Sequence, residues 1–243
     1  MVDKITAKEY AALRLGNDVI IPTIACWDTA EEIDFATLPN SFVLKTSHGG
    51  GSNGVIIVKD KNKADLKIIQ NQMAKSLKSD IYNSYREWPY KDVRPRILAE
   101  PLMKNASDNE LIDYKFYCFN GIPKLCQVIA DRHKNETIDF FDTRWNHMPF
   151  FGLNQTGSTI KQAVTPPTRP MNLERMIDYA TKLASDTPFL RVDLYEINGK
   201  VYFGEMTFFP ASGIGFFSPS EWDERLGDMI DISELQKKIS VRQ

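Results

Sequence analysis

The sequence predicts an α+β protein in which tight turns join antiparallel strands and two amphipathic helices cover them. Three observations lead to this prediction. Segments rich in β-branched and aromatic residues flank Asn120-Gly121 and Asn198-Gly199, a pattern typical of β-hairpins. A third pair of apolar segments encloses the glycine-rich loop 47–54. Apolar residues recur at helical spacing over 64–79 and 172–185.

Length and composition exclude several classes of protein. The 243 residues are 42% hydrophobic and 26% charged, which suffices for one large or two small domains. A net charge of −2 without a long basic run argues against a duplex nucleic acid as partner. The N-terminus lacks a signal peptide's apolar segment, and no apolar run approaches the ~20 residues of a membrane span. Three scattered cysteines without a CxxC pair indicate a reduced, cytoplasmic protein.

The other elements follow from local patterns of apolar residues, proline and glycine. In chain order we expect a helix over 6–15, a buried edge strand over 19–26, a helix start at 28–32, a loop over 82–96, strands over 96–103 and 137–141, an irregular loop over 152–170 and short helices at the end of the chain.

The glycine-rich segment has the form strand, loop, strand. Gly49, Gly51 and Gly54 fit G-x-G-x-x-G, but a β-branched run follows them instead of the helix of a dinucleotide-binding fingerprint. A glycine flap between antiparallel strands can close over phosphates, because backbone without Cβ approaches closely and its N–H groups face the anion. Lys45 would add a positive charge. A hairpin loop without a ligand is the alternative, and the absence of His-Arg-Asp and Asp-Phe-Gly excludes a protein kinase.

The hairpin over 189–207 carries four polar residues at odd positions: Arg191, Asp193, Glu205 and Thr207. A two-residue turn at Asn198-Gly199 would place Asp193 opposite Gly204 and send Glu205 to the other face of the sheet. A three-residue loop would place all four on one face, with Asp193 and Glu205 close enough to share a cation. The alternative is an exposed hairpin whose charges balance in solvent.

Together, these features resemble the ATP-grasp superfamily, in particular its TupA-like branch, named for teichuronopeptide biosynthesis. The closest resemblance lies in DYKFYCFNG (113–121) and YFGEMTFFP (202–210), and it runs from Asp3-Lys4 to about Asp231. It implies an α+β ATP-grasp fold of two subdomains whose antiparallel sheets clasp ATP. On this basis we divide the chain into a remnant of an N-terminal region over 1–40, a first subdomain with the flap over 41–98 and a second with the metal site over 99–243. The N-terminal substrate domain of many relatives is expected to be reduced or missing.

The resemblance also implies residue roles. Lys4 and Lys45 would contact the phosphates of ATP, with the flap above them formed by Ser47, His48, Gly49, Gly50, Gly51 and Ser52. The backbone of Glu100, Pro101 and Leu102 would read adenine, and the ribose position falls at Asp113 or Tyr114. Lys115 and Arg144 are further nucleotide-binding candidates. Asp193 and Glu205 match carboxylates that bridge Mg²⁺, and Thr207 stands where Asn is common. Arg191 would stabilise the transferred phosphoryl group, and the N–H groups of Ser212 and Gly213 would bind an oxyanion.

The resemblance thus implies an ATP- and Mg²⁺-dependent carboxylate–amine ligase that works through an acyl phosphate. The expected partners are a sugar acid or polysaccharide carboxylate and an amino acid or other amine, in cell-surface polysaccharide (capsule) biosynthesis. Mg²⁺ and cationic side chains would screen the repulsion between the phosphates of ATP and the carboxylate. Two alternatives remain: a phosphotransferase that stops at a phosphorylated sugar, and a non-catalytic nucleotide-binding module that serves a partner protein in a biosynthetic complex.

Overall fold

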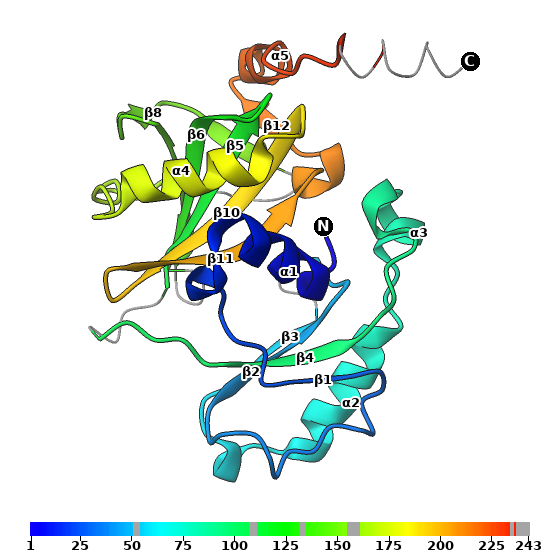
Figure 1. Ribbon diagram of the computed structural model, residues 1–243. Coiled ribbons are helices and arrows are strands. Elements are labelled where there is room, and N and C mark those ends of the chain that lie inside the picture. The colour runs from blue at the N-terminus through cyan, green and yellow to red at the C-terminus, as the bar shows by residue number, and fades with distance from the viewer. Residues whose placement is uncertain (51–53, 107–110, 132–134, 155–160, 234–235, 237–243) are drawn as a thin grey trace. The chain divides into compact units, whose positions relative to one another are not determined.

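The computed structural model describes residues 1–50, 54–106, 111–131, 135–154, 161–233 and 236. The chain forms two compact units, residues 1–104 and 105–243 (Figure 1). Among the residues described, no helix is long and apolar enough to cross a membrane.

The first unit is built on a four-stranded antiparallel sheet. Its strands are β1 (Ala25–Trp27), β2 (Phe42–Thr46), β3 (Val55–Val58) and β4 (Ile97–Pro101), in the order β1-β4-β2-β3. Helix α2 (Leu66–Leu77) buries Ile69 and Met73 against the strand residues Phe42, Leu44 and Ile97. The sheet thus presents one face to α2 and leaves the other for polar groups.

The remaining elements of this unit lie outside the sheet. Helix α1 (Lys4–Leu15) is capped by Asp3, whose carboxylate accepts hydrogen bonds from the amides of Ile5 and Thr6. Helix α3 (Ile81–Tyr85) and three 3-10 helices, η1 (Asn17–Val19), η2 (Lys61–Lys63) and η3 (Trp88–Tyr90), occupy the connections.

The second unit contains a six-stranded antiparallel sheet in the order β11-β10-β5-β6-β7-β8. The strands are β5 (Asp113–Phe119), β6 (Ile122–Ala130), β7 (Thr137–Asp142), β8 (His147–Met148), β10 (Phe189–Ile197) and β11 (Lys200–Thr207). Helix α4 (Leu173–Ala184) contacts β5, β6 and β10. Strands β9 (Phe151–Asn154) and β12 (Phe216–Ser218) form a small second sheet, followed by α5 (Glu221–Gly227), while η4 (Pro210–Gly213) follows β11.

Most predicted elements are confirmed, and the exceptions lie in the connections. The strand expected over 19–26 is reduced to β1 at the sheet edge, as Pro22 indicated. The helix start expected at 28–32 is wrong: the Glu32 carboxylate accepts the amides of Asp28 and Thr29, which closes a turn. The predicted loop over 82–96 contains most of α3 and all of η3, and β9 (Phe151–Asn154) extends into the predicted loop over 152–170.

The hairpin of β10 and β11 places Asp193 opposite Glu205, but it does so through a β-bulge and not through the predicted three-residue loop. Its turn is the two-residue Asn198-Gly199, with φ of 52° and 75°, and Ile197 pairs with Lys200. A β-bulge then leaves Gly204 without a partner, so that Leu194 pairs with Phe203 but Asp193 pairs with Glu205. The three-residue loop is therefore wrong, although the shared face of Asp193 and Glu205 is correct.

Candidate nucleotide and metal site

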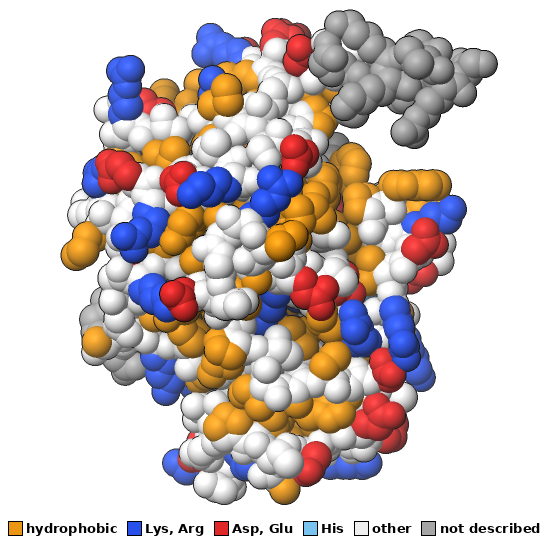
Figure 2. All heavy atoms as spheres, in the orientation of Figure 1, with side chains coloured by type: hydrophobic (Ala, Val, Ile, Leu, Met, Phe, Trp, Pro, Cys, Tyr) orange, Lys and Arg blue, Asp and Glu red, His pale blue; other side chains and the backbone are white. Residues whose placement is uncertain are grey.

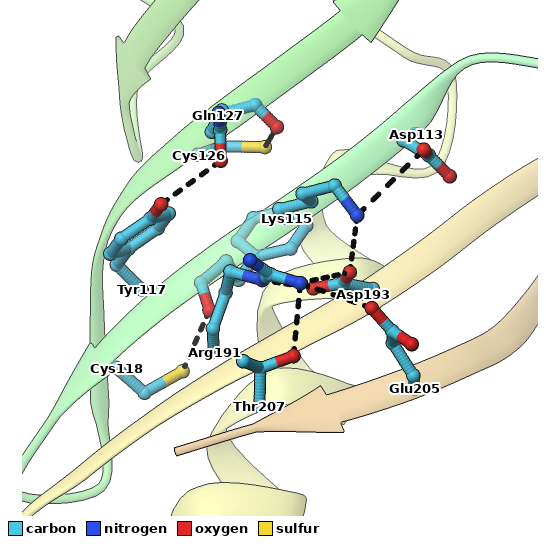
Figure 3. Close-up of polar contacts among 11 residues, drawn as sticks. Asp113, Lys115, Tyr117, Cys118, Cys126, Gln127, Arg191, Asp193, Glu205 and Thr207 are labelled. Atoms are coloured by element: carbon cyan, nitrogen blue, oxygen red, sulfur yellow. Dashed lines mark hydrogen bonds and ion pairs between the residues drawn. The ribbon is translucent and has the colours of Figure 1, made fainter. Parts of the chain in front are cut away.

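Arg191 is the centre of a polar cluster on β10 and β11 (Figure 3). Its Nε and Nη2 donate to the two carboxylate oxygens of Asp193, at 2.7 and 2.8 Å. Nη2 also lies 3.1 Å from Oε1 of Glu205 and 2.9 Å from Oγ1 of Thr207. One guanidinium thus holds the three candidate metal ligands together, which the register across the bulge makes possible.

Strand β5 adds a second cation to this cluster. Lys115 lies opposite Asp193 in the β5–β10 register, and its Nζ donates to Oδ2 of Asp193. The same Nζ lies 3.7 Å from Oδ2 of Asp113. Burial opposes ionisation of Asp193, but Arg191 and Lys115 outweigh it and lower the pKa of the carboxyl to about 2. Asp193 is therefore a permanent anion at neutral pH.

The oxygen donors of the cluster fit a divalent cation. Asp193 and Glu205 face each other on neighbouring strands, and Thr207 adds a hydroxyl, a donor set that Mg²⁺ accepts. The Glu205 side chain is 33% exposed, so that its carboxylate is accessible from solvent. No group of three or more His, Cys, Asp or Glu suited to a metal occurs in the described part of the chain. A bound cation would thus need oxygens from Thr207, water or the phosphates of a substrate.

The first unit holds a separate charged cluster around Glu100. This carboxylate is 3% exposed, and Lys45 lies 2.6 Å from its Oε2. Lys8 bonds to Oε1 and also donates to the backbone carbonyl of Ile21 at 2.8 Å. Burial opposes ionisation of Glu100, but Lys45 and Lys8 lower its pKa. The side chain of Glu100 therefore positions two lysines. From the sequence we expected a role only for the backbone of Glu100, as a contact to adenine.

The base of the flap is fixed by several hydrogen bonds. Lys4 donates its Nζ to the carbonyl of Gly49 and its amide to the carbonyl of Ser47, at 2.9 Å for the amide. Ser47 Oγ accepts the amide of Arg96 at 3.1 Å. His48 Nε2 lies 3.0 Å from the carbonyl of Ser79, which can only accept, so that Nε2 carries the proton. Gly50 follows these residues, whereas Gly51 and Ser52 lie outside the described part of the chain.

The remaining predicted site residues are described within their own units. Arg144 is exposed in the turn after β7, three strands from β10. The Ser212 amide donates to the carbonyl of Phe209 at 2.9 Å, so that binding an oxyanion would require this bond to open. Gly213 is exposed in the same turn, where Ala211 and Ser212 also have positive φ. Pro101 and Leu102, at the end of β4, are partly buried.

The sequence model of the TupA-like ATP-grasp family matches residues 1–231 of the chain. The chain belongs to this family. The predicted α+β ATP-grasp fold is thereby confirmed, and solved structures agree with it. The D-alanine–D-alanine ligase of Bacillus anthracis, solved with ATP, matches with a TM-score of 0.54 and 17% identity, over 98% of this chain and 66% of the ligase. The D-alanine–D-alanine ligase of Coxiella burnetii matches with a TM-score of 0.50 and 16% identity, over 99% of this chain and 60% of the ligase.

This TupA-like ATP-grasp chain thus spans less than two thirds of the length of either ligase. No curated protein sequence matches it. At these identities the likeness to the solved structures concerns the fold, and the reaction has to be argued from the residues of the chain.

Sequence reasoning missed two groups that take part in the clusters. Lys8 binds Glu100, and its spacing of four residues from Lys4 would have been a signal for it if the predicted helix over 6–15 had begun at Lys4, as α1 does. Gln127 on β6 accepts a hydrogen bond from the hydroxyl of Tyr117 at 2.9 Å, and Tyr117 lies opposite Arg191 in the β5–β10 register (Figure 3). No local motif marks this pair, because only the pairing of β5 with β6 and β10 brings it beside the cluster.

Proposed function

We propose that this TupA-like ATP-grasp protein is a cytoplasmic, ATP- and Mg²⁺-dependent carboxylate–amine ligase. The observation that supports it most directly is the pairing of Asp193 with Glu205 across the β-bulge, with Arg191 bonded to both. Arg191 and Lys115 supply the positive charge that allows these two carboxylates to face each other, and a ligase that uses ATP needs such a pair of oxygen ligands for its metal. The family and its fold are consistent with this class of reaction.

The chain offers distinct groups for binding the nucleotide. Lys4 and Lys45 carry positive charge at the base of the flap and beside Glu100, and we assign them to the phosphates of ATP. Asp193, Glu205 and Thr207 would hold Mg²⁺, which would neutralise phosphate charge when bound. The Gly49 amide donates to the carbonyl of Thr46 at 3.3 Å, so that among the described flap glycines we assign the N–H group of Gly50 to the phosphates.

The reaction would proceed in two displacements. A carboxylate oxygen of the acceptor attacks the γ-phosphorus of ATP, the bond to the β–γ bridging oxygen breaks, and ADP leaves. Arg191 would stabilise negative charge on the transferred group, and each well-placed donor of this kind lowers the barrier by about 3–4 kcal/mol. The amine then attacks the carbonyl carbon of the acyl phosphate, inorganic phosphate leaves, and the amine loses a proton to form the amide.

The acceptor that we propose is a sugar acid or polysaccharide carboxylate in cell-surface polysaccharide synthesis. This substrate class is supported by the membership in the TupA-like family.

The decisive experiment measures ADP release by the purified chain with ATP, Mg²⁺, glucuronate and a panel of amino acids. We expect release that requires both the acid and one of the amines, and that is lost in Asp193→Asn and after chelation of the metal. Lys63→Gln serves as the matched control, since Lys63 forms an exposed surface pair with Asp60. ADP release without an amine, together with a stable phosphoester, would identify a phosphotransferase instead. ATP binding without any ADP release would identify a non-catalytic module.

A further inference from the structure

Lys115 on β5 is a buried lysine whose ammonium lies between two carboxylates (Figure 3). Its Nζ donates to Oδ2 of Asp193 and lies 3.7 Å from Oδ2 of Asp113. Figure 2 shows Lys and Arg side chains exposed beside acidic ones on the surface, whereas Lys115 is 6% exposed and Asp193 is 1% exposed. Removing charges from water is costly, so that stability alone is a weak explanation for a buried pair of this kind.

Oδ2 of Asp193 is the oxygen that a shared cation would use, and two donors already engage it. Nη2 of Arg191 lies 2.8 Å from Oδ2 of Asp193 and 3.1 Å from Oε1 of Glu205, so that Oδ2 is on the side of Glu205. The second donor to Oδ2 is Nζ of Lys115. A carboxylate oxygen offers two lone pairs, and both of those on Oδ2 are used. A metal that bridges Asp193 and Glu205 must therefore displace one of the two cations from this oxygen.

Lys115 is the cation that can leave. Arg191 makes four hydrogen bonds within the cluster, two of them to Asp193. Among the described residues Lys115 donates only to Asp193, and the carboxylate of Asp113 is close enough to replace that partner. Asp113 and Lys115 stand two positions apart on β5, so that both side chains lie on the face of the sheet that carries Asp193. Rotation of the flexible lysine side chain would transfer its ammonium from Asp193 to Asp113.

The charges of the cluster oppose a free metal ion. Among the described residues three carboxylates, those of Asp113, Asp193 and Glu205, face the two cations Lys115 and Arg191, which leaves one net negative charge. A divalent cation alone would reverse this charge in a largely buried site, whereas a divalent cation that carries the phosphates of a nucleotide would not. Without Lys115 the cluster would carry two net negative charges, which match a divalent cation.

From these observations we propose that Lys115 is an internal competitor of the metal: its ammonium holds the metal position on Asp193 and moves to Asp113 when the metal enters with the nucleotide. This inference rests on the proposed function, since it concerns the metal site of the same reaction. Lys115 is thus a positioning residue that acts on the reaction through Asp193. It makes the carboxylates select a nucleotide-bound cation over the free cation.

Titration of the full chain with Mn²⁺ alone, followed by the EPR signal of the free ion, tests the proposal without turnover, because Mn²⁺ takes the same oxygen donors as Mg²⁺. Lys115→Met has a similar length without the charge. We expect it to bind Mn²⁺ at least about tenfold more tightly than the parent chain, because a like charge has left the site. Lys115→Arg keeps the charge and should bind no more tightly than the parent. Lys182→Met is the matched control, since Lys182 forms an exposed pair with Asp178 at 2.7 Å in the same unit.

A double variant locates the gain in affinity: addition of Asp193→Asn to Lys115→Met should abolish the tight Mn²⁺ site. Circular dichroism first shows that each variant is folded, and Lys115→Gln takes the place of Lys115→Met if the latter is not.

Unchanged or weaker Mn²⁺ binding by the folded uncharged variant would overturn the proposal, because a lysine with only a structural role does not oppose the metal. A tight site that survives Asp193→Asn would do the same. Failure of the ligase assignment would look different, as tighter Mn²⁺ binding by Lys115→Met in a chain whose parent releases no ADP with any acid and amine.

Discussion

Gly204 carries no functional group, yet the geometry of the candidate metal site depends on it. The β-bulge at this residue moves Glu205 into register with Asp193, which the two-residue turn at Asn198-Gly199 alone would not do. A Cβ on residue 204 would lie 2.9 Å from Cε2 of Tyr195 and 3.0 Å from the backbone oxygen of Asp193. The backbone contact cannot be relieved by a side-chain rotation. We therefore expect Gly204→Ala to distort the bulge.

The expected change in the free energy of unfolding of Gly204→Ala is the sum of two opposing contributions. Replacing Gly by Ala in a strand gains roughly 0.5–1 kcal/mol, because the unfolded chain loses freedom. Overpacking against fixed backbone costs about 1–3 kcal/mol. The overpacking term is the larger, so that we expect a net loss of about 1–2 kcal/mol, or roughly 2–8 °C in Tm for a chain of this size.

The assay combines thermal unfolding with ADP release. Gly204→Ala should lose activity to nearly the level of Asp193→Asn, because a slip by one residue sends Glu205 to the opposite face of the sheet. Gly227→Ala is the control: a Cβ there meets no atom within 4 Å, so that Tm should not fall. The reasoning would be refuted if Gly204→Ala kept both the parent Tm and the parent activity, or if a structure of the variant kept Asp193 opposite Glu205 without displacement.

Three further predictions concern the buried charges. Asp193→Asn should lower the free energy of unfolding by about 3–5 kcal/mol in urea titrations, because it leaves Arg191 buried without its main anion, and an unchanged urea midpoint would argue against this role. Acid unfolding should report the same carboxylate: since folding lowers the pKa of Asp193 from 3.8 to about 2, its stabilising contribution is complete above about pH 4 and is lost as the pH falls towards 2, so Asp193→Asn should flatten this part of the stability curve. Glu100→Gln should cost about 3 kcal/mol in the same titrations, whereas Lys63→Gln should cost less than about 0.5 kcal/mol, and equal effects would contradict the importance of burial.

The local sequence was sufficient to predict the hairpin turns and the amphipathic helices, because these elements depend on residues that are close together in the chain. The Asn-Gly dipeptides marked both hairpin turns, because few other residues adopt positive φ at two successive positions. The 3.6-residue spacing of apolar side chains marked α2 and α4, which bury that face. In the first 40 residues local pattern was a weaker guide, since the segment 28–32 is closed by the side chain of Glu32 and forms no helix.

The sequence by itself determined that Arg191 and Asp193 lie on one face of a strand, because side chains alternate with period two. It also placed Lys45 at the end of the strand that enters the flap. Tertiary structure alone decided that Asp193 meets Glu205, since the bulge depends on the close approach of Gly204 to the neighbouring strand. It likewise decided that the buried Glu100 holds two lysines from other elements. Partners that come from separate segments are selected by packing and burial, which no local pattern encodes.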